Sequence, residues 1–117
     1  MSDDVIFHLV PGEYYRDSDS SGPYRPATFD EEGFIHCTQG VDNVAAVGNR
    51  HYKDDRRMYI VLVIDRLKVE PEIRYDDAAR IYPHIYGPLN RDAITDILPV
   101  LRESDGSFLP PNLKLRK

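Results

Sequence analysis

The stretch MYIVLVI, residues 58–64, is apolar at every position. A strand with one face in water alternates apolar and polar side chains, whereas a strand that is covered on both faces does not. The stretch therefore predicts a central β-strand that is buried on both faces. It is too short to cross a lipid bilayer as a helix, which takes about 20 apolar residues.

Further strands are predicted on both sides of this segment. Residues 5–10 (VIFHLV) and 33–38 (GFIHCT) are short β-rich runs, and residues 73–75 (IRY) form a shorter one. Residues 93–98 (AITDIL) fit either a last strand or a short helix. Residues 78–89 contain two prolines and a glycine, so they predict an irregular or edge-like segment.

The predicted helical content is small. Apolar residues recur at helical spacing over residues 41–52, which predicts an amphipathic helix with Thr38 as its N-cap. Residues 28–32 predict a single helical turn capped by Thr28, after a polar loop at residues 17–23. Strands outnumber helices and do not alternate with them, which indicates the α+β class rather than a doubly wound α/β sheet.

The composition limits the class of protein. The 117 residues predict one domain, with a core at about residues 5–109 and a C-terminal tail at residues 110–117. A net charge of −5 disfavours duplex nucleic acid as a partner, and the basic cluster of Lys114, Arg116 and Lys117 is expected to be the solvated end of the tail. The acidic N-terminus lacks the features of a signal peptide, and the single cysteine excludes an internal disulfide. We therefore expect a cytoplasmic protein that does not bind a membrane.

Three histidines are the best candidates for chemistry. His8 shares a strand face with Ile6 and Val10, where it is either a core-edge histidine bonded to the backbone or an imidazole that contacts a ligand. His36 lies in a predicted strand, and His84 lies in the proline-rich segment. We expect all three side chains to open into one pocket, with facing imidazoles within roughly 10 Å, the scale of a small-ligand cleft.

Aromatic side chains accompany one of these histidines. If the proline-rich segment is extended, Tyr82 and Tyr86 lie on the same face as His84. Their flat rings can stack on a planar ligand. We therefore expect Tyr82 or Tyr86 to line the same pocket.

Other reactive groups are expected to lie outside the site. Cys37 is expected to point into the core as a small apolar residue, and His51 is expected on the surface outside the pocket. The carboxylate pairs at residues 54–55 and 76–77 are expected to be solvated surface. Glu32 is a partial exception, because it closely precedes a histidine-bearing strand.

A metal site is an alternative use of the three histidines. The intervals between His8, His36 and His84 match neither a zinc finger nor a His-Glu-x-x-His motif. We expect no metal, and metal-dependent hydrolysis by these three residues stays open as an alternative.

Four separate motifs, in their order and spacing, resemble one family. They are IFHLVP at residues 6–11, EEGFIHCT at 31–38, NRHY at 49–52 and YPHIYGPL at 82–89. Over about residues 5–109 the chain is similar to the small bacterial family known as domain of unknown function 952. The resemblance implies a fold like that of ADP-ribosyltransferases, which is a split, mostly antiparallel β-structure with a cleft for a nicotinamide dinucleotide.

The resemblance also implies roles for particular residues. His8 takes the position from which that fold offers a histidine or arginine to the nicotinamide ribose. His36 and Thr38 match in kind the residues that line the nicotinamide pocket. The glutamate that usually drives transfer has no counterpart at the matching place, where the nearest segment carries His84 and Tyr86.

Together these expectations define a function and an alternative. The chain is expected to bind or act on NAD or an ADP-ribose-like nucleotide, by glycosidic cleavage or by ADP-ribosyl transfer. The missing glutamate leaves open a non-catalytic module that binds a small ligand. The candidate catalytic residues are His36 and His84, and the candidate ligand-binding residues are His8, Thr38, Tyr82 and Tyr86.

Overall fold

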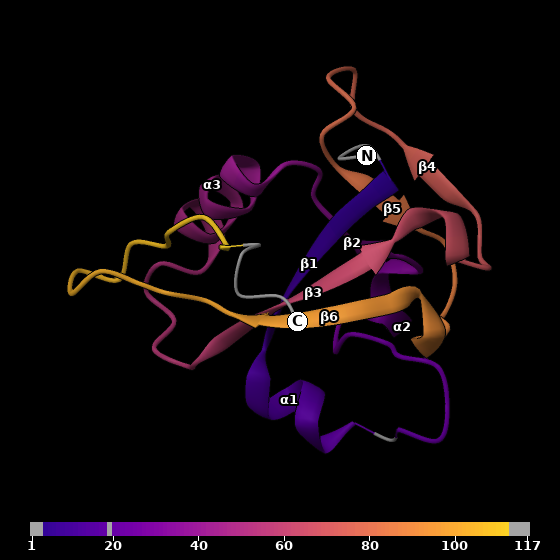
Figure 1. The fold of residues 1–117 in the computed structure, drawn as a ribbon, viewed down its shortest axis with the longest axis horizontal. Coiled ribbons are helices and arrows are strands. Elements are labelled where there is room, and N and C mark those ends of the chain that lie inside the picture. The colour runs from indigo at the N-terminus through magenta and orange to yellow at the C-terminus, as the bar shows by residue number, and fades with distance from the viewer. Residues whose placement is uncertain (1–3, 19, 113–117) are drawn as a thin grey trace.

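The framework of the fold is a three-stranded antiparallel sheet with the order β1-β3-β6 (Figure 1). Its strands are β1 (Val5–Pro11), β3 (Tyr59–Asp65) and β6 (Ile94–Pro99). The central strand, β3, contains four consecutive residues, 61–64, that are completely buried. The prediction of a central strand covered on both faces is therefore confirmed, and the last segment is a strand rather than a helix.

The computed structural model describes residues 4–18 and 20–112. Of the C-terminal tail predicted at residues 110–117, residues 113–117 lie outside the described residues, and with them the cluster of Lys114, Arg116 and Lys117. None of the helices in the described ranges has the length and apolar character needed to cross a lipid bilayer.

A second antiparallel sheet has the order β2-β5-β4. Its strands are β2 (Ile35–His36), β4 (Ile73–Tyr75) and β5 (Pro83–Ile85). The central position of β5 corrects the expectation that this segment is irregular or edge-like. Pro83 is tolerated because it is the first residue of the strand, and its carbonyl still accepts a hydrogen bond from the Cys37 amide at 3.0 Å. The fold is thus α+β with mostly antiparallel strands.

Side chains of β1 and β3 alternate between two hydrophobic cores. One core joins the two sheets, and its buried members are Ile6, Val10, Tyr24, Ile35, Cys37, Leu62, Ile64, Ile85, Leu89 and Ala93. The other core lies on the opposite face of the first sheet, where Phe7, Val61 and Val63 pack with Leu98 of β6 and Val44 of a helix. The predicted strand parity of β1, with His8 on the face of Ile6 and Val10, is confirmed by this division.

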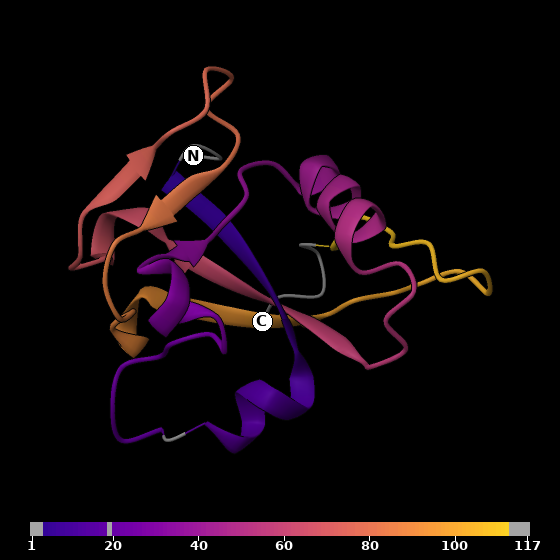
Figure 2. The same ribbon diagram turned by 180° about the vertical axis from the view of Figure 1, so that it is seen from behind.

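Three short helices complete the described structure, together with two single 3-10 turns (Figure 2). The helices are α1 (Gly12–Asp17), α2 (Phe29–Glu32) and α3 (Val41–His51), and the turns are η2 (Arg66–Lys68) and η3 (Arg91–Ala93). The helix α1 was not predicted, because Pro11 and Gly12 together are typical of a chain break. Here the Gly12 amide donates to the Met58 carbonyl at 2.8 Å, which ties the start of α1 to the chain entering β3.

Of the two predicted helix caps, the one at Thr38 is wrong and the one at Thr28 is correct in position. The N-cap of α3 is Gly40, whose φ of 89° suits a glycine, and not Thr38. Thr38 is instead held by Phe7, since each residue's amide donates to the other's carbonyl at 2.8 Å. Thr28 does occupy the cap position of α2, but its side chain makes no capping hydrogen bond.

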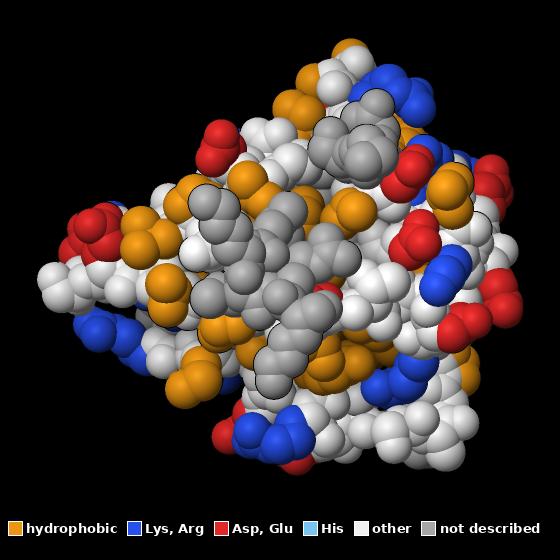
Figure 3. Space-filling view, viewed as in Figure 1, with side chains coloured by type: hydrophobic (Ala, Val, Ile, Leu, Met, Phe, Trp, Pro, Cys, Tyr) orange, Lys and Arg blue, Asp and Glu red, His pale blue; other side chains and the backbone are white. Residues whose placement is uncertain are grey.

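β6 forms an outer edge of the first sheet. Figure 3 shows apolar side chains in patches on this face of the molecule, with acidic and basic groups between them. Ile97 of β6 is 46% exposed, and Leu101, shortly after the strand, is 55% exposed. These values contrast with the complete burial of the centre of β3, as expected for an outer strand and a central one.

Gly48 allows the ring of Phe108 to lie directly on α3. A Cβ atom at Gly48 would overlap Phe108 Cγ, at a separation that real Cβ contacts do not show. We expect Gly48→Ala to lower the free energy of unfolding by about 1–3 kcal/mol, the cost of overpacking, as measured by urea denaturation. In a Phe108→Ala background the same change should be neutral or stabilising by up to about 1 kcal/mol, because alanine favours the helix. Equal losses in both backgrounds would contradict this packing explanation.

Candidate functional site

Two adjoining pockets lie beside the short strand β2. The outer pocket has a volume of about 750 Å³, within the usual range for small-molecule sites, and the inner pocket is smaller at about 210 Å³. The outer pocket lies between the β2-β5-β4 sheet and α3, and the inner pocket lies between β1, α1 and the end of α3. Five residues line both pockets: Thr28, His36, Thr38, Val47 and Tyr52.

His36 and His84 meet on one face of the second sheet. They are directly opposed in the antiparallel pairing of β2 with β5, so their side chains leave the sheet on the same side. Their ring centroids are 5.0 Å apart, and both side chains line the outer pocket. The prediction that these two histidines share a pocket is confirmed, while their catalytic role stays a prediction.

Each of the two imidazoles is bonded to its own carboxylate. His36 Nε2 lies 3.1 Å from Glu32 Oε1, and His84 Nδ1 lies 3.0 Å from Asp76 Oδ2. The hydroxyl of Tyr86 donates to the same Asp76 oxygen at 2.7 Å. Asp76 is exposed, as expected, and the pairing of β4 with β5 also brings it beside His84. The other ring nitrogen of each histidine has no hydrogen-bond partner among the described residues.

Both carboxylates favour the ionised form. Partial burial opposes the charge of Glu32, but hydrogen bonds from His36 and Thr28 outweigh it and hold the pKa of Glu32 below its usual value. The hydrogen bond from Tyr86 is the main cause that holds the pKa of Asp76 below its usual value, with a further contribution from His84. At neutral pH the site therefore holds two anions that can orient the imidazoles and stabilise positive charge.

Phe34 is a member of the site that the sequence reasoning missed. Its ring stacks on His84 with centroids 4.3 Å apart and an interplanar angle of 11°, and it meets His36 edge-on at 4.9 Å. A signal was available, because strand parity places Phe34 and His36 on the same face. The stack restrains the orientation of the His84 ring.

His8 has a structural position between the two sheets. Its Nδ1 lies 2.7 Å from the carbonyl of His36, and its Nε2 lies 2.8 Å from the hydroxyl of Tyr24. A carbonyl can only accept, so Nδ1 carries the proton and Nε2 accepts from Tyr24. Burial lowers the pKa of His8 to about 4, so the ring is neutral at neutral pH. Of the two alternatives for His8, the core-edge histidine bonded to the backbone describes this geometry.

The three histidines do not line one common pocket, which corrects that expectation. His8 lines the inner pocket, His84 lines the outer pocket, and His36 lies between them and lines both. Both ring nitrogens of His8 are already engaged, which argues against the three-histidine metal site. In the described part of the chain, no group of three or more His, Cys, Asp or Glu side chains is placed to hold a metal ion.

The remaining predicted residues are distributed over both pockets and the core. Tyr82 lines the outer pocket, and Thr38, which is buried, lines both pockets. Cys37 is 2% exposed within the core between the sheets, as predicted, and burial raises the pKa of its thiol. His51 was expected outside the pocket and instead lines the outer one, because the polar side of the last turn of α3 faces this pocket.

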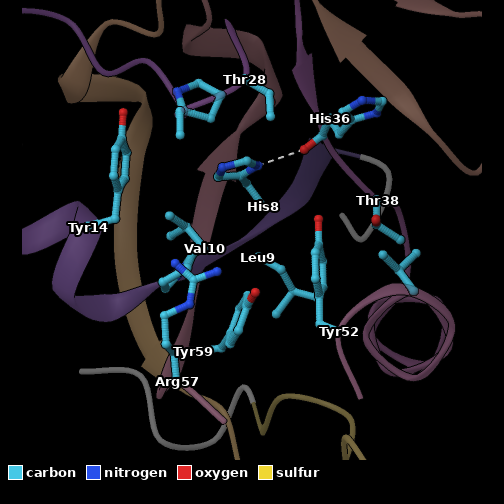
Figure 4. Close-up of a pocket in the computed structure, with 14 residues that line it drawn as sticks. His8, Leu9, Val10, Tyr14, Thr28, His36, Thr38, Tyr52, Arg57 and Tyr59 are labelled. Atoms are coloured by element: carbon cyan, nitrogen blue, oxygen red, sulfur yellow. Dashed lines mark hydrogen bonds between the residues drawn. The ribbon is translucent and has the colours of Figure 1, made fainter. Parts of the chain in front are cut away.

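The inner pocket is surrounded by hydroxyl-bearing rings (Figure 4). In this view Tyr59 stands below His8, with the guanidinium of Arg57 6.0 Å from its ring centroid, and Tyr52 stands to the right. Arg57 is bonded through Nε and Nη2 to Asp55, and this pairing holds the pKa of Asp55 well below its usual range. Asp55 was expected to be solvated surface, and it instead fixes a cation at the inner pocket.

The comparisons with known proteins identify a family and a fold. The sequence model of the family described as "Protein of unknown function (DUF952)" matches residues 9–97. The crystal structure of CC0527 from Caulobacter crescentus is similar with a TM-score of 0.73 and 16% identity, covering 94% of this chain and 95% of that one. The solution structure of the same protein gives a TM-score of 0.69 and 18% identity, with coverage of 97% and 94%. No curated protein matches the sequence.

The buried His8 should make stability depend on pH. Its folded pKa of about 4 lies below the ordinary value of 6.5, so as the pH falls the unfolded chain takes up the proton first. The stabilisation is fully present above about pH 6.5 and is lost progressively down to about pH 4, by at most about 3 kcal/mol.

Urea denaturation between about pH 7 and about pH 4.5 should show this loss. The matched variant is His8→Asn, whose amide can donate to the same carbonyl of His36 but does not titrate. The wild-type free energy of unfolding should fall more steeply with decreasing pH than that of the variant. Equal slopes would show that His8 is not the group responsible.

Proposed function

The chain belongs to the DUF952 family of proteins of unknown function, and we propose that it binds NAD or an ADP-ribose-like nucleotide and cleaves its glycosidic bond in the outer pocket. The observation that carries the proposal is the pair of imidazoles 5.0 Å apart, each bonded to its own carboxylate. Such pairs are suited to proton transfer near neutral pH, because the carboxylate orients the ring and the second ring nitrogen stays available.

The chemistry requires stabilisation of positive charge at a sugar. When the bond between the anomeric carbon and the nicotinamide nitrogen breaks, its electron pair goes to the ring nitrogen and the ribose gains oxocarbenium character. The ionised Glu32, held beside His36, would stabilise that charge. Water then bonds to the anomeric carbon and loses one proton, for which His84, oriented by Asp76, is the acceptor.

Glu32 is a candidate for the carboxylate that the sequence motifs lack. The resemblance implied a glutamate on the segment that carries His84, where this chain has none. Glu32 precedes β2 and reaches the same histidine pair from the opposite strand. We propose that it takes over this function, on a fold of the ADP-ribosyltransferase type with the cleft beside β2.

Binding is the first test of this function. Calorimetric titration with NAD, ADP-ribose and a 2′-phosphorylated nucleotide should show saturable binding by at least one of them. His36→Ala and His84→Ala should weaken binding or turnover, and His36→Ala should cost little stability because its side chain is 57% exposed. No binding of any of the three at millimolar concentration, with the protein folded, would overturn the proposal.

Turnover is the second test, and it separates an enzyme from a binding module. The wild-type protein should release nicotinamide from NAD in proportion to its concentration. Glu32→Gln and Asp76→Asn should each slow the release by about 10²-fold or more, the usual size of acid–base and electrostatic contributions. The matched controls are Glu72→Gln and Asp54→Asn, which lie outside both pockets. Binding without release would instead indicate the non-catalytic module.

A further inference from the structure

The last turn of α3 forms a wall of the outer pocket that the proposed chemistry does not use. Arg50 and His51 are the last two residues of α3, and both line this pocket. The carboxylates of Glu32, Asp76 and Asp77 line the same pocket, from α2 and from the chain after β4. The pocket thus has basic side chains on α3 (the basic wall) and acidic side chains on other elements (the acidic wall).

Each carboxylate of the acidic wall already accepts a hydrogen bond from another group of the protein. Glu32 is bonded to His36 and Asp76 to His84, while Asp77 accepts from the backbone amides of residues 81 and 82 at 2.9 and 3.0 Å. These carboxylates can still accept from the hydroxyl groups of a ligand, since each oxygen has two acceptor sites. They would repel an anion, so this wall suits a sugar rather than a phosphate.

Arg50 differs from these groups because its charge is uncompensated. It makes no hydrogen bond or ion pair with any described residue, whereas Arg57 is paired with Asp55 and Arg74 with Glu72. Of the described residues that line the outer pocket, it is the one with a permanent positive charge. His51 beside it supplies a ring N–H donor in either protonation state.

We propose that Arg50 and His51 bind an anionic group of the ligand, so that the outer pocket selects a phosphorylated sugar, with its hydroxyls on the acidic wall and its phosphate on α3. The assignment of this phosphate to a nucleotide rests on the proposed function, whereas anion binding by Arg50 does not. The C-terminal end of α3 itself disfavours an anion, because helix dipoles are negative there. The attraction must therefore come from the side chains, and Arg50 determines the specificity.

The test uses inorganic pyrophosphate as a probe and the backbone amide resonances of the full chain as the readout. Addition of millimolar pyrophosphate should shift the signals of residues 50–52, and Arg50→Gln should reduce this response at least about tenfold, as expected for loss of a charge-assisted hydrogen bond. The matched control is Arg56→Gln, since Arg56 is likewise exposed and without a partner among the described residues but does not line the outer pocket. An unaltered response in Arg50→Gln, or no response in the wild type, would overturn the inference.

A second arm separates this inference from the proposed function. If ADP-ribose binds, Arg50→Gln should weaken its binding by about 10-fold or more while the weaker binding of unphosphorylated adenosine stays unchanged. Equal weakening of both ligands would overturn the assignment to phosphate, because a general structural defect would affect both. A positive pyrophosphate result without nucleotide binding would support the anion site and count against the proposed function alone.

Discussion

The rest of the structure depends on the burial of both faces of β3. The backbone N–H and C=O groups of such a strand must form hydrogen bonds with a strand on each side. Its apolar side chains point to both faces of the sheet, so each face must be covered by a separate core. β1 and β6 supply the backbone partners. The second sheet covers one face and α3 with the chain after β6 covers the other. The position of each candidate site residue follows from this arrangement.

The link from that core to the site is a short series of hydrogen bonds. His8 projects from β1 toward the second sheet and donates to the carbonyl of His36, and the backbone bonds between Phe7 and Thr38 hold the neighbouring residues. β2 is thereby fixed to the first sheet at two points, although it is only two residues long. Since β2 pairs with β5, the position of His84 is set as well. The buried histidine thus acts as a positioning residue for the two histidines that line the outer pocket.

Much of this fold could be predicted from the sequence, because periodicity reports which faces are buried. The apolar run at residues 58–64 predicts the central strand, and the parity of β1 predicts the side on which His8 lies. The register between strands is not encoded locally, so the contact of Asp76 with His84 and the central position of β5 could not be derived. The wrong cap at Thr38 has a related cause, since Thr38 has a suitable side chain but its backbone pairs with that of Phe7. His51 was misplaced because an amphipathic pattern separates apolar from polar faces but does not tell a polar pocket from bulk solvent.

Stability alone does not account for the two histidine–carboxylate pairs. The His36 side chain is 57% exposed and its partner Glu32 is 37% exposed, and pairs in such positions contribute about 0–1 kcal/mol. In the second pair His84 is 17% exposed, but its partner Asp76 is 47% exposed. His8, by contrast, lies in the core and satisfies two buried groups, so its hydrogen bonds are part of the stability of the fold. The same residue type therefore has two uses in this chain, one inside and one at the surface. Both imidazoles line the outer pocket and each is oriented by a carboxylate, which supports the proposal that they serve binding or proton transfer rather than packing.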